Sequence, residues 1–388
     1  MDIKQIDQQY IAGTYARFPL QIVSGCGAVL KDEQGNEYID MASGIAVNTF
    51  GACDPVWAEA VAKQANTLQH ISNLYYTNPC VELAQMLCEK TGMSKVFFSN
   101  SGAEANECAI KAARLYAANK KGKEYYTIIT LQNSFHGRTI TTLAATGQDG
   151  FHNDFTPLTE GFVYCPANDV EALTALVKEH KCAAIMMEPV QGEGGVLPLT
   201  EEFVKTARDL CDANDMVLIF DEVQTGNGRT GSLYAYMQFG IMPDVVSTAK
   251  GLAGGLPLGA TLLGEKMQTV FTPGSHGSTF GGNPVCCAGA ISILSRLTDE
   301  LMDEVKAKST YIFEELSAAQ GVKSVSGMGL MIGIETVKDA TQIVNECMAN
   351  GVLVIKAKTK VRLLPPLNIT TEQLQKAITV LKNACKEA

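Results

Sequence analysis

The sequence lacks any long apolar run. Stretches such as VLIF at 217–220 and VCCAGAISIL at 285–294 fall short of the roughly 20 residues that a membrane-spanning helix needs. The start, MDIKQIDQQYIAGTY, has no basic segment followed by an apolar one, and no arginine precedes Arg17, so neither a signal peptide nor a transit peptide is expected. Basic residues are also scarce, 31 against 41 acidic ones. We therefore expect a soluble, cytoplasmic protein whose main partner is neither nucleic acid nor a membrane.

Metal-binding and disulfide patterns are missing as well. The twelve cysteines are scattered along the chain without a C-x-x-C pair, and the five histidines show no H-x-x-x-H or H-E-x-x-H spacing. We predict no metal site, and we interpret the cysteines as reduced, mostly buried thiols of a cytosolic protein.

With 388 residues, the chain is longer than one hydrophobic core usually organises, so two domains are expected. The middle of the chain alternates short apolar segments with amphipathic ones, which is typical of an α/β fold with a mostly parallel sheet and helices on both faces. We predict strands at 95–100, 125–131, 183–190, 216–222 and 244–249, a helix from Glu104 to about Ala118, a hairpin tip at Gly35-Asn36 and a final helix over 371–388.

No long linker marks a domain boundary, so the boundaries rest on the change of pattern. We predict a large domain over residues 56–284 and a smaller α+β domain over residues 285–388. The short N-terminal strands within residues 1–55 are expected to join the small domain, because they are antiparallel in character.

Polar residues gather where predicted strands end. Asp221 follows VLIF, Glu188 follows IMM, and the segments 99–101 and 135–138 follow two other strands. Active sites of open α/β sheets lie beyond the carboxyl ends of the strands, so these residues are expected to share a site. A carboxylate such as Asp221 is either solvated at the strand end or paired with a cation in a cleft.

Each further motif allows a structural and a functional interpretation. Ser101 followed by Glu104 is a capping box, yet the same helix start offers N–H groups to a phosphate. Lys250, just before a glycine-rich stretch, is either a surface lysine or one that forms Schiff bases. The glycines and hydroxyls of 274–284 suit an anion, and Arg138 and Arg362 are either surface residues or carboxylate ligands.

Taken together, these parts are what pyridoxal phosphate (PLP) requires: a Schiff-base lysine, an acid for its pyridinium nitrogen and a phosphate cradle. The motifs also resemble those of a known family. Among them are NSGAEANECAIKAAR at 100–114, NSFHGRT at 133–139, EPVQGEGG at 188–195, LIFDEVQTGNGRTG at 218–231, STAKGLAGGLPLGA at 247–260 and GSHGSTFGGNP at 274–284.

The chain resembles, nearly end to end, the class III aminotransferases of the fold type I PLP enzymes, and most closely those that act on acetylornithine. The resemblance implies a large domain with a mostly parallel seven-stranded sheet, a smaller α+β domain, and a dimer with shared active sites. It implies ping-pong transfer of the terminal (δ) amino group of N-acetylornithine to 2-oxoglutarate, which yields N-acetylglutamate semialdehyde and glutamate in arginine biosynthesis.

The resemblance also implies roles for single residues. Lys250 binds PLP covalently and moves protons, and Asp221 pairs with the ring nitrogen. Phe135 stacks on the ring and Gln224 reaches its phenolic oxygen. The phosphate is held by Ser101, Gly102 and Ala103 and, from the neighbouring subunit, by Thr279.

For the substrates, the resemblance implies that Arg362 binds the α-carboxylate of glutamate. Arg138 binds the far carboxylate of glutamate or the α-carboxylate of acetylornithine. Glu193 neutralises Arg362 when the amino donor has no carboxylate there, Ser278 touches substrate, and Glu188 gives a supporting hydrogen bond.

Several relatives within the fold remain as alternatives. Ornithine enzymes usually place a tyrosine where this chain has Ile45, which argues against free ornithine. Succinylornithine stays open because the loop 356–361 is unusually basic, and 4-aminobutyrate and aminomutase activities share most of the site. The chain has GACDP at 51–55 where the family often has G-H-x-H-P, which affects local packing. A nicotinamide enzyme is excluded, because the glycines of 327–333 have the wrong spacing.

Overall fold

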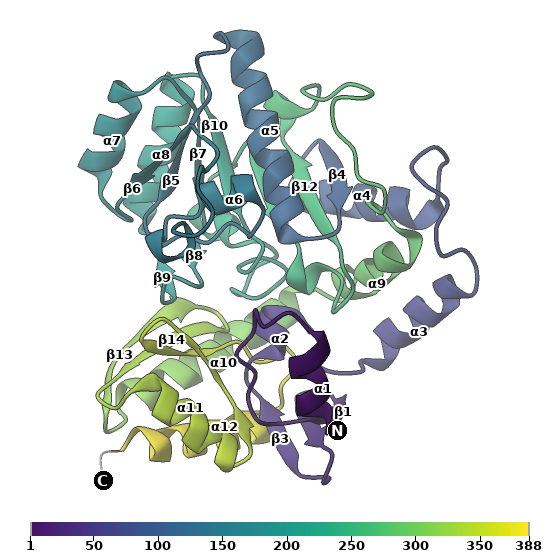
Figure 1. Ribbon diagram of the computed structural model, residues 1–388, viewed down its shortest axis with the longest axis vertical. Helices are drawn as coiled ribbons and strands as arrows, with labels where there is room; N and C mark the ends of the chain where they lie inside the picture. The colour runs from purple at the N-terminus through teal and green to yellow at the C-terminus, as the bar shows by residue number, and fades with distance from the viewer. Residues whose placement is uncertain (1, 387–388) are drawn as a thin grey trace.

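The computed structural model describes residues 2–386, and its larger part is built on a seven-stranded sheet (Figure 1). The strand order is β4 (Lys95–Ser99), β12 (Gly259–Leu263), β11 (Val245–Thr248), β10 (Val217–Asp221), β7 (Cys182–Met187), β5 (Thr127–Leu131) and β6 (Phe162–Cys165). In this sheet, as far as residues 2–386 describe it, β12 alone runs against the direction of the other strands. The prediction of an α/β fold with a mostly parallel sheet is confirmed, and β6 and β12 are strands that were not predicted.

Helices cover both faces of this sheet because its strands are apolar on both sides. On β10, Val217 and Ile219 pack with the alanine-rich face of α5 (Gly102–Lys120), while Leu218 and Phe220 belong to the cluster on the opposite face. That opposite face is covered by α7 (Val170–Glu179) and α8 (Glu201–Ala213). The sheet is therefore enclosed, and only the ends of its strands are available to form a site.

The C-terminal part has its own antiparallel sheet of β13 (Val322–Met328), β14 (Met331–Thr336), β17 (Lys360–Leu363) and β16 (Ile355–Ala357). Its helices are α10 (Asp299–Ser317), α11 (Ala340–Ala349) and α12 (Thr371–Cys385). The predicted final helix thus ends at Cys385, and residues 387–388 lie outside the described residues.

The N-terminal strands lie beside the C-terminal part in Figure 1. The strands β1 (Ile22–Cys26), β2 (Val29–Asp32) and β3 (Glu37–Asp40) form a meander, with the predicted hairpin tip between β2 and β3. β3 then pairs in parallel with β15 (Val352–Leu353). α9 (Pro284–Leu294) packs on α3 (Pro55–Ala65) and α4 (Asn78–Thr91). The domain boundaries at 55/56 and 284/285 stay a prediction.

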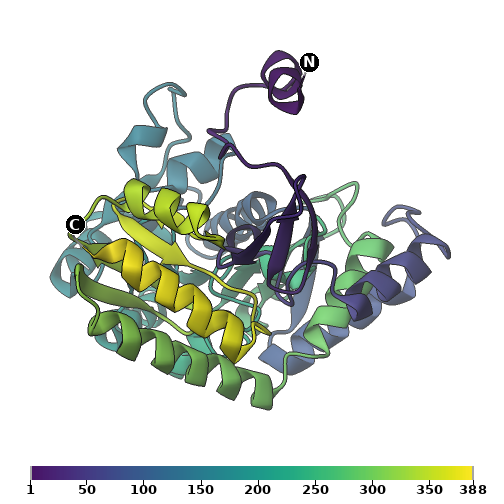
Figure 2. The same ribbon diagram turned by 90° about the horizontal axis from the view of Figure 1, so that it is seen from below.

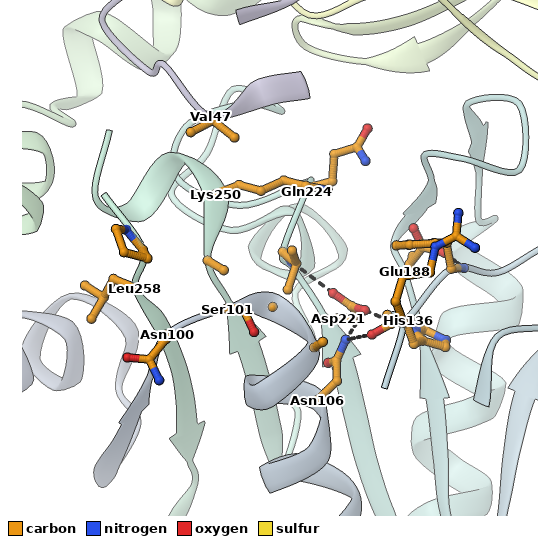
Figure 3. Close-up of a pocket in the computed structure, with 18 of the residues that line it drawn as sticks. Val47, Asn100, Ser101, Asn106, His136, Glu188, Asp221, Gln224, Lys250 and Leu258 are labelled. Atoms are coloured by element: carbon orange, nitrogen blue, oxygen red, sulfur yellow. Dashed lines mark hydrogen bonds and ion pairs between the residues drawn. The ribbon is translucent and has the colours of Figure 1, made fainter. Parts of the chain in front are cut away.

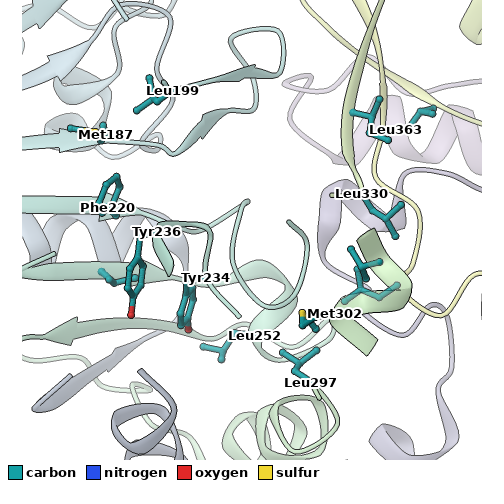
Figure 4. Packing of buried hydrophobic residues seen from close by; sticks show 14 of the residues in the cluster. Met187, Leu199, Phe220, Tyr234, Tyr236, Leu252, Leu297, Met302, Leu330 and Leu363 are labelled. Carbon is teal, nitrogen blue, oxygen red and sulfur yellow. The ribbon is translucent and has the colours of Figure 1, made fainter. Parts of the chain in front are cut away.

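One apolar cluster continues from the large sheet into the C-terminal part (Figure 4). Phe220 and Tyr234 lie on the large-sheet side, and Leu330 and Leu363 on the other, all fully buried. The two parts are therefore packed directly against each other next to the strand ends. Among the helices of residues 2–386, none combines the length and the apolar character needed to cross a membrane.

Candidate active site

A cavity of about 440 Å³ lies at the carboxyl ends of the strands of the large sheet (Figure 3). Predicted site residues that line it are Ser101, Gly102, Ala103, Phe135, Arg138, Asp221, Gln224 and Lys250. The strand ends deliver these side chains to one place, as the rule for open α/β sheets predicts.

Asp221, the last residue of β10, is only 2% exposed and is held by three donors. Its Oδ2 accepts from Asn106 Nδ2 at 2.7 Å and contacts His136 Nδ1 at 2.8 Å, and its Oδ1 accepts from the Val223 N–H at 3.0 Å. Figure 3 shows Asn106 and His136 directed at this carboxylate. The carboxylate is thus fixed in position although it is buried.

Asn106 was not predicted as a site residue, and His136 was expected at the site only as part of the segment 135–138, without a role. The sequence does hold a signal for Asn106. Asn106 follows Gly102 by four residues, so the two residues lie on the same face of the helix. That face consists mainly of small residues, and Asn106 is the polar residue among them. His136 stands between two predicted site residues, but nothing in the sequence indicates its partner, Asp221, which comes 85 residues later.

The start of α5 provides an anion site next to Asp221. Ser101 is the N-cap: its Oγ accepts from the Glu104 N–H at 3.2 Å and donates to the Glu104 carboxylate at 3.0 Å. The N–H groups of Gly102 and Ala103, the first residues of the helix, have no acceptor within the helix and lie at the cavity. A Cβ on Gly102 would lie 2.7 Å from Val223 Cγ1, so this close approach requires glycine.

Lys250 is half-buried in the cavity, in a backbone conformation with φ of 45° that side chains rarely adopt. The backbone on both sides of it is tied down: Asn227 Nδ2 donates to the Ala249 carbonyl at 3.2 Å, and Thr49 Oγ1 donates to the Gly251 carbonyl at 2.8 Å. Burial lowers the pKa of Lys250, and the nearby Glu193 carboxylate opposes this shift only in part. A lowered pKa makes the neutral, nucleophilic amine more available.

Arg362, on β17 of the C-terminal part, does not line the cavity itself, and neither does Glu193, but it contacts the lining residue Gln224. It is 2% exposed, and its Nη1 donates to Glu193 Oε1 at 2.6 Å and to Gln224 Oε1 at 3.1 Å. Burial acts to raise the pKa of Glu193, but the charge and hydrogen bond of Arg362, together with Lys250 and Gln224, outweigh it and the pKa is lowered. The predicted Arg362–Glu193 pair is therefore present in the structure, next to Lys250.

Arg138 lies on the outer side of the cavity and is exposed. Its guanidinium carbon lies 4.1 Å from the ring centroid of Phe151 and 5.5 Å from that of Phe135. The Phe135 N–H donates to Glu188 Oε1 at 2.9 Å, and burial raises the pKa of Glu188 to about 7. Phe151, which positions Arg138, was missed because it follows by thirteen residues without a motif.

The structure separates Thr279 from this group. Ser278 Oγ accepts from Asn100 Nδ2 at 3.2 Å, and Asn100 lines the cavity, but Thr279 is exposed and does not line the cavity of its own chain. Its role in a neighbouring subunit stays a prediction.

Known proteins are similar to this chain in sequence and in fold. Residues 10–385 match the model of the family described as aminotransferase class-III. The chain is 50% identical over 387 residues to an acetylornithine aminotransferase of Haemophilus ducreyi, covering 99% of this chain and 98% of that protein. It is 43% identical to the corresponding protein of Methanocaldococcus jannaschii, covering 98% and 97%.

Solved structures of aminotransferases have the same fold as this chain. An ornithine aminotransferase of Toxoplasma gondii, with PLP partially occupying its active site, superposes with a TM-score of 0.94 at 33% identity and covers 98% of this chain and 93% of that one. An N-acetylornithine aminotransferase of Stenotrophomonas maltophilia superposes with a TM-score of 0.84 at 35% identity, covering 98% and 97%. The match over residues 10–385 and the identity along nearly the whole chain show that the protein belongs to the class III aminotransferases, which are PLP-dependent enzymes.

Proposed function

We propose that this enzyme transfers the δ-amino group of N-acetylornithine to 2-oxoglutarate, a step of arginine biosynthesis. Relatives that are 42–50% identical over nearly the full chain carry the name acetylornithine aminotransferase. The observation that carries the proposal is the Arg362–Glu193 pair beside Lys250, with 2.6 Å between Nη1 and Oε1. A cation that an internal carboxylate neutralises suits a site that accepts an uncharged chain in one half-reaction and a carboxylate in the other.

The cavity fits PLP. Free N–H groups at Gly102 and Ala103 suit its phosphate, Asp221 suits its protonated ring nitrogen, and Lys250 suits its carbonyl carbon. We assign Phe135 to the ring face and Gln224 to the phenolic oxygen. When bound, PLP draws electrons from the substrate carbon and so makes a proton on that carbon removable.

The chain's own residues then handle the proton and the charge. The Lys250 amine, with its lowered pKa, would be the base that accepts and holds the proton of the substrate carbon. Asn106 and His136 hold the Asp221 carboxylate in position, so its charge remains aimed at the ring nitrogen.

Substrate choice depends on two arginines. We assign Arg362 to the α-carboxylate of glutamate or 2-oxoglutarate, which displaces Glu193, and Arg138 to the far carboxylate of the diacid or the α-carboxylate of N-acetylornithine. Glu193 is 30% exposed in its side chain, so it has access to solvent when it leaves Arg362.

We further propose a homodimer in which Ser278 and Thr279 complete the partner's site. Large apolar side chains are exposed around this loop: Leu74 (83%), Tyr75 (65%), Tyr76 (99%) and Phe280 (59%). Asn73 Nδ2 links the two segments by donating to the carbonyls of Ser278 and Gly281. The helix α1 (Ile3–Tyr10), which projects from the body in Figure 2, also has no buried residue. Such apolar surface is typical of an interface.

We also propose that the enzyme works in the cytoplasm. Its twelve cysteines are all free in the structure, and most are buried. Free thiols persist in a reducing compartment.

The test separates the half-reactions. Purified PLP-loaded enzyme is mixed with N-acetylornithine alone, and the visible absorbance of the cofactor is followed before and after 2-oxoglutarate is added. We expect conversion to the amino form and then its reversal. Conversion by ornithine or 4-aminobutyrate but not by N-acetylornithine would overturn the substrate assignment and leave the family intact. Lys250→Ala is the control in which neither change occurs.

A further inference from the structure

Arg229 is a buried cation that joins the two parts of the molecule. It lies in the loop after β10, is 3% exposed, and its Nη1 donates to the carbonyls of Leu330 at 3.1 Å and Pro365 at 2.5 Å, both in the C-terminal part. Burial lowers its pKa to about 9, and Asp40 is the acid that opposes this shift. Among residues 2–386 no carboxylate forms an ion pair with it within 4 Å. A guanidinium held by carbonyls alone is costly to bury, so it needs a reason to be there.

Asp40, at the end of β3, organises the segment above the cavity. Its Oδ1 accepts from the N–H groups of Ala42 at 2.8 Å and Ser43 at 2.9 Å. Residues 43–46 have φ angles of 50°, 61°, 65° and 60°, so the element labelled α2 (Ser43–Ala46) is a left-handed turn. Three of them are not glycine and Ile45 is β-branched, so the turn is strained and persists only because its surroundings impose it.

The left-handed turn connects directly to the strand that carries Arg362. Ser43 Oγ donates to the Leu364 carbonyl, and the Leu364 N–H donates to the Met41 carbonyl at 2.7 Å. The next carbonyl, that of Pro365, accepts from Arg229. The two residues after Leu363, where β17 ends, are thus held from both sides by buried groups.

The same contacts reach Lys250. Val47, which follows the turn, lines the cavity, and Thr49 Oγ1 donates to the carbonyl of Gly251, next to Lys250. The Leu367 N–H also donates to the Thr49 carbonyl at 2.9 Å. Thr230 also packs closely against Gly329, in the turn of the β13–β14 hairpin. A Cβ on Gly329 would lie 2.4 Å from the carbonyl carbon of Thr230.

We infer that Arg229, together with Asp40, is a positioning residue that sets the place of Arg362 relative to Lys250, and thereby the affinity for dicarboxylate substrates, without touching substrate. Arg229 ties the large-domain loop to the segment after Arg362, and Asp40 ties the strained turn to the same segment through Ser43. This inference rests on the proposed function, because it takes Arg362 as the ligand of the substrate carboxylate.

The test compares Arg229→Lys with the wild-type enzyme, both loaded with PLP. A lysine keeps the charge but its single ammonium lacks the planar fork of the guanidinium, so the segment 363–365 is released. We expect the KM for 2-oxoglutarate, and the Kd of the unreactive dicarboxylate glutarate measured by calorimetry, to rise about tenfold or more, since small displacements of a binding group have effects of this size. The rate of the half-reaction with N-acetylornithine should stay within about threefold of wild type.

Asp40→Asn is the second variant. Its amide oxygen still accepts from Ala42 and Ser43, but the charge that faces Arg229 is gone, so a smaller rise in the same two constants is expected. The matched control is Arg114→Lys. Arg114 is half-buried and, like Arg229, donates to two carbonyls, those of Tyr126 at 3.2 Å and Glu160 at 2.6 Å, but both lie within the large domain.

The outcomes separate a positioning role from a purely structural one. If Arg229→Lys lowers the melting temperature but leaves both dicarboxylate constants at wild-type values, or if Arg114→Lys changes them equally, the inference is overturned. A loss that affects both half-reactions to the same extent also overturns it. The proposed function is tested separately by the wild-type half-reaction with N-acetylornithine, which is measured before any variant is compared.

Discussion

The Arg362–Glu193 pair leads to a quantitative prediction for Glu193→Gln. With the roles we propose, 2-oxoglutarate has to displace the Glu193 carboxylate, whose Oε1 lies 2.6 Å from Arg362 Nη1. Two unit charges about 4 Å apart attract each other by about 4 kcal/mol at an effective dielectric constant near 20. Because the Glu193 side chain is 30% exposed, solvent screening reduces this attraction. We take about 1–2 kcal/mol for the net advantage of the acid over a neutral amide.

The variant keeps the shape of the side chain and one hydrogen-bond acceptor but removes the charge. We therefore expect the KM for 2-oxoglutarate to fall by roughly 5- to 30-fold, because 1.4 kcal/mol corresponds to a factor of ten. The opposite change is expected for N-acetylornithine: an Arg362 charge that nothing neutralises faces the uncharged chain of the amino donor, so kcat/KM should fall by a similar factor of about 5 to 30.

Rapid-mixing measurements of each half-reaction would test this, with Glu171→Gln as the control for loss of an exposed acid on α7. The reasoning is refuted if the variant leaves the KM for 2-oxoglutarate unchanged. It is equally refuted if both substrates improve or worsen together, because the pair acts on the two substrates in opposite directions.

Three further predictions follow from the site. Gly102→Ala should weaken PLP binding about tenfold or more, since a Cβ would lie 2.7 Å from Val223 Cγ1; equilibrium dialysis that shows wild-type affinity would contradict the cradle. Lys250→Ala should release all PLP on denaturation after borohydride treatment, whereas wild type should retain a covalent adduct by mass spectrometry. Burial raises the pKa of Glu222 from 4.5 to about 7, so the stability that its bound proton contributes is fully present below pH 4.5 and is lost as the pH rises through 7. The unfolding free energy should fall by up to about 3 kcal/mol across this window, and Glu222→Gln should flatten the fall in thermal unfolding; an unchanged slope would count against it.

The alternation of apolar and amphipathic segments was sufficient to predict the α/β fold, but β12 was not predicted, and an apolar run could not have given its direction. A strand that is buried on both faces has the same apolar run whether it is parallel or antiparallel to its neighbours. The direction of β12 is therefore set only by its pairing with β4 and β11. The strand β6 was missed as well, because it is a short edge strand whose first three residues are only half-buried and so lack the continuous apolar run of the inner strands.

The site, too, could be predicted from the sequence only in part. Asp221 and Lys250 could be predicted from the sequence because each follows a strand, and strand ends form the sites of such sheets. The pairing of Asp221 with Asn106 and His136 could not be predicted, because Asn106 precedes Asp221 by 115 residues and His136 precedes it by 85. The placement of Thr279 in a partner's site stays a prediction.

By itself, the sequence determined the family, the cofactor and the type of fold, since motifs near strand ends carry their chemistry locally. Only the tertiary structure decided how Arg229, Asp40 and the left-handed turn at 43–46 meet the segment after Arg362. Residues such as Ser43 and Ile45 prefer a right-handed or extended backbone when isolated. Their left-handed conformation, and the burial of Arg229, exist because contacts across more than 100 positions of the chain hold them there.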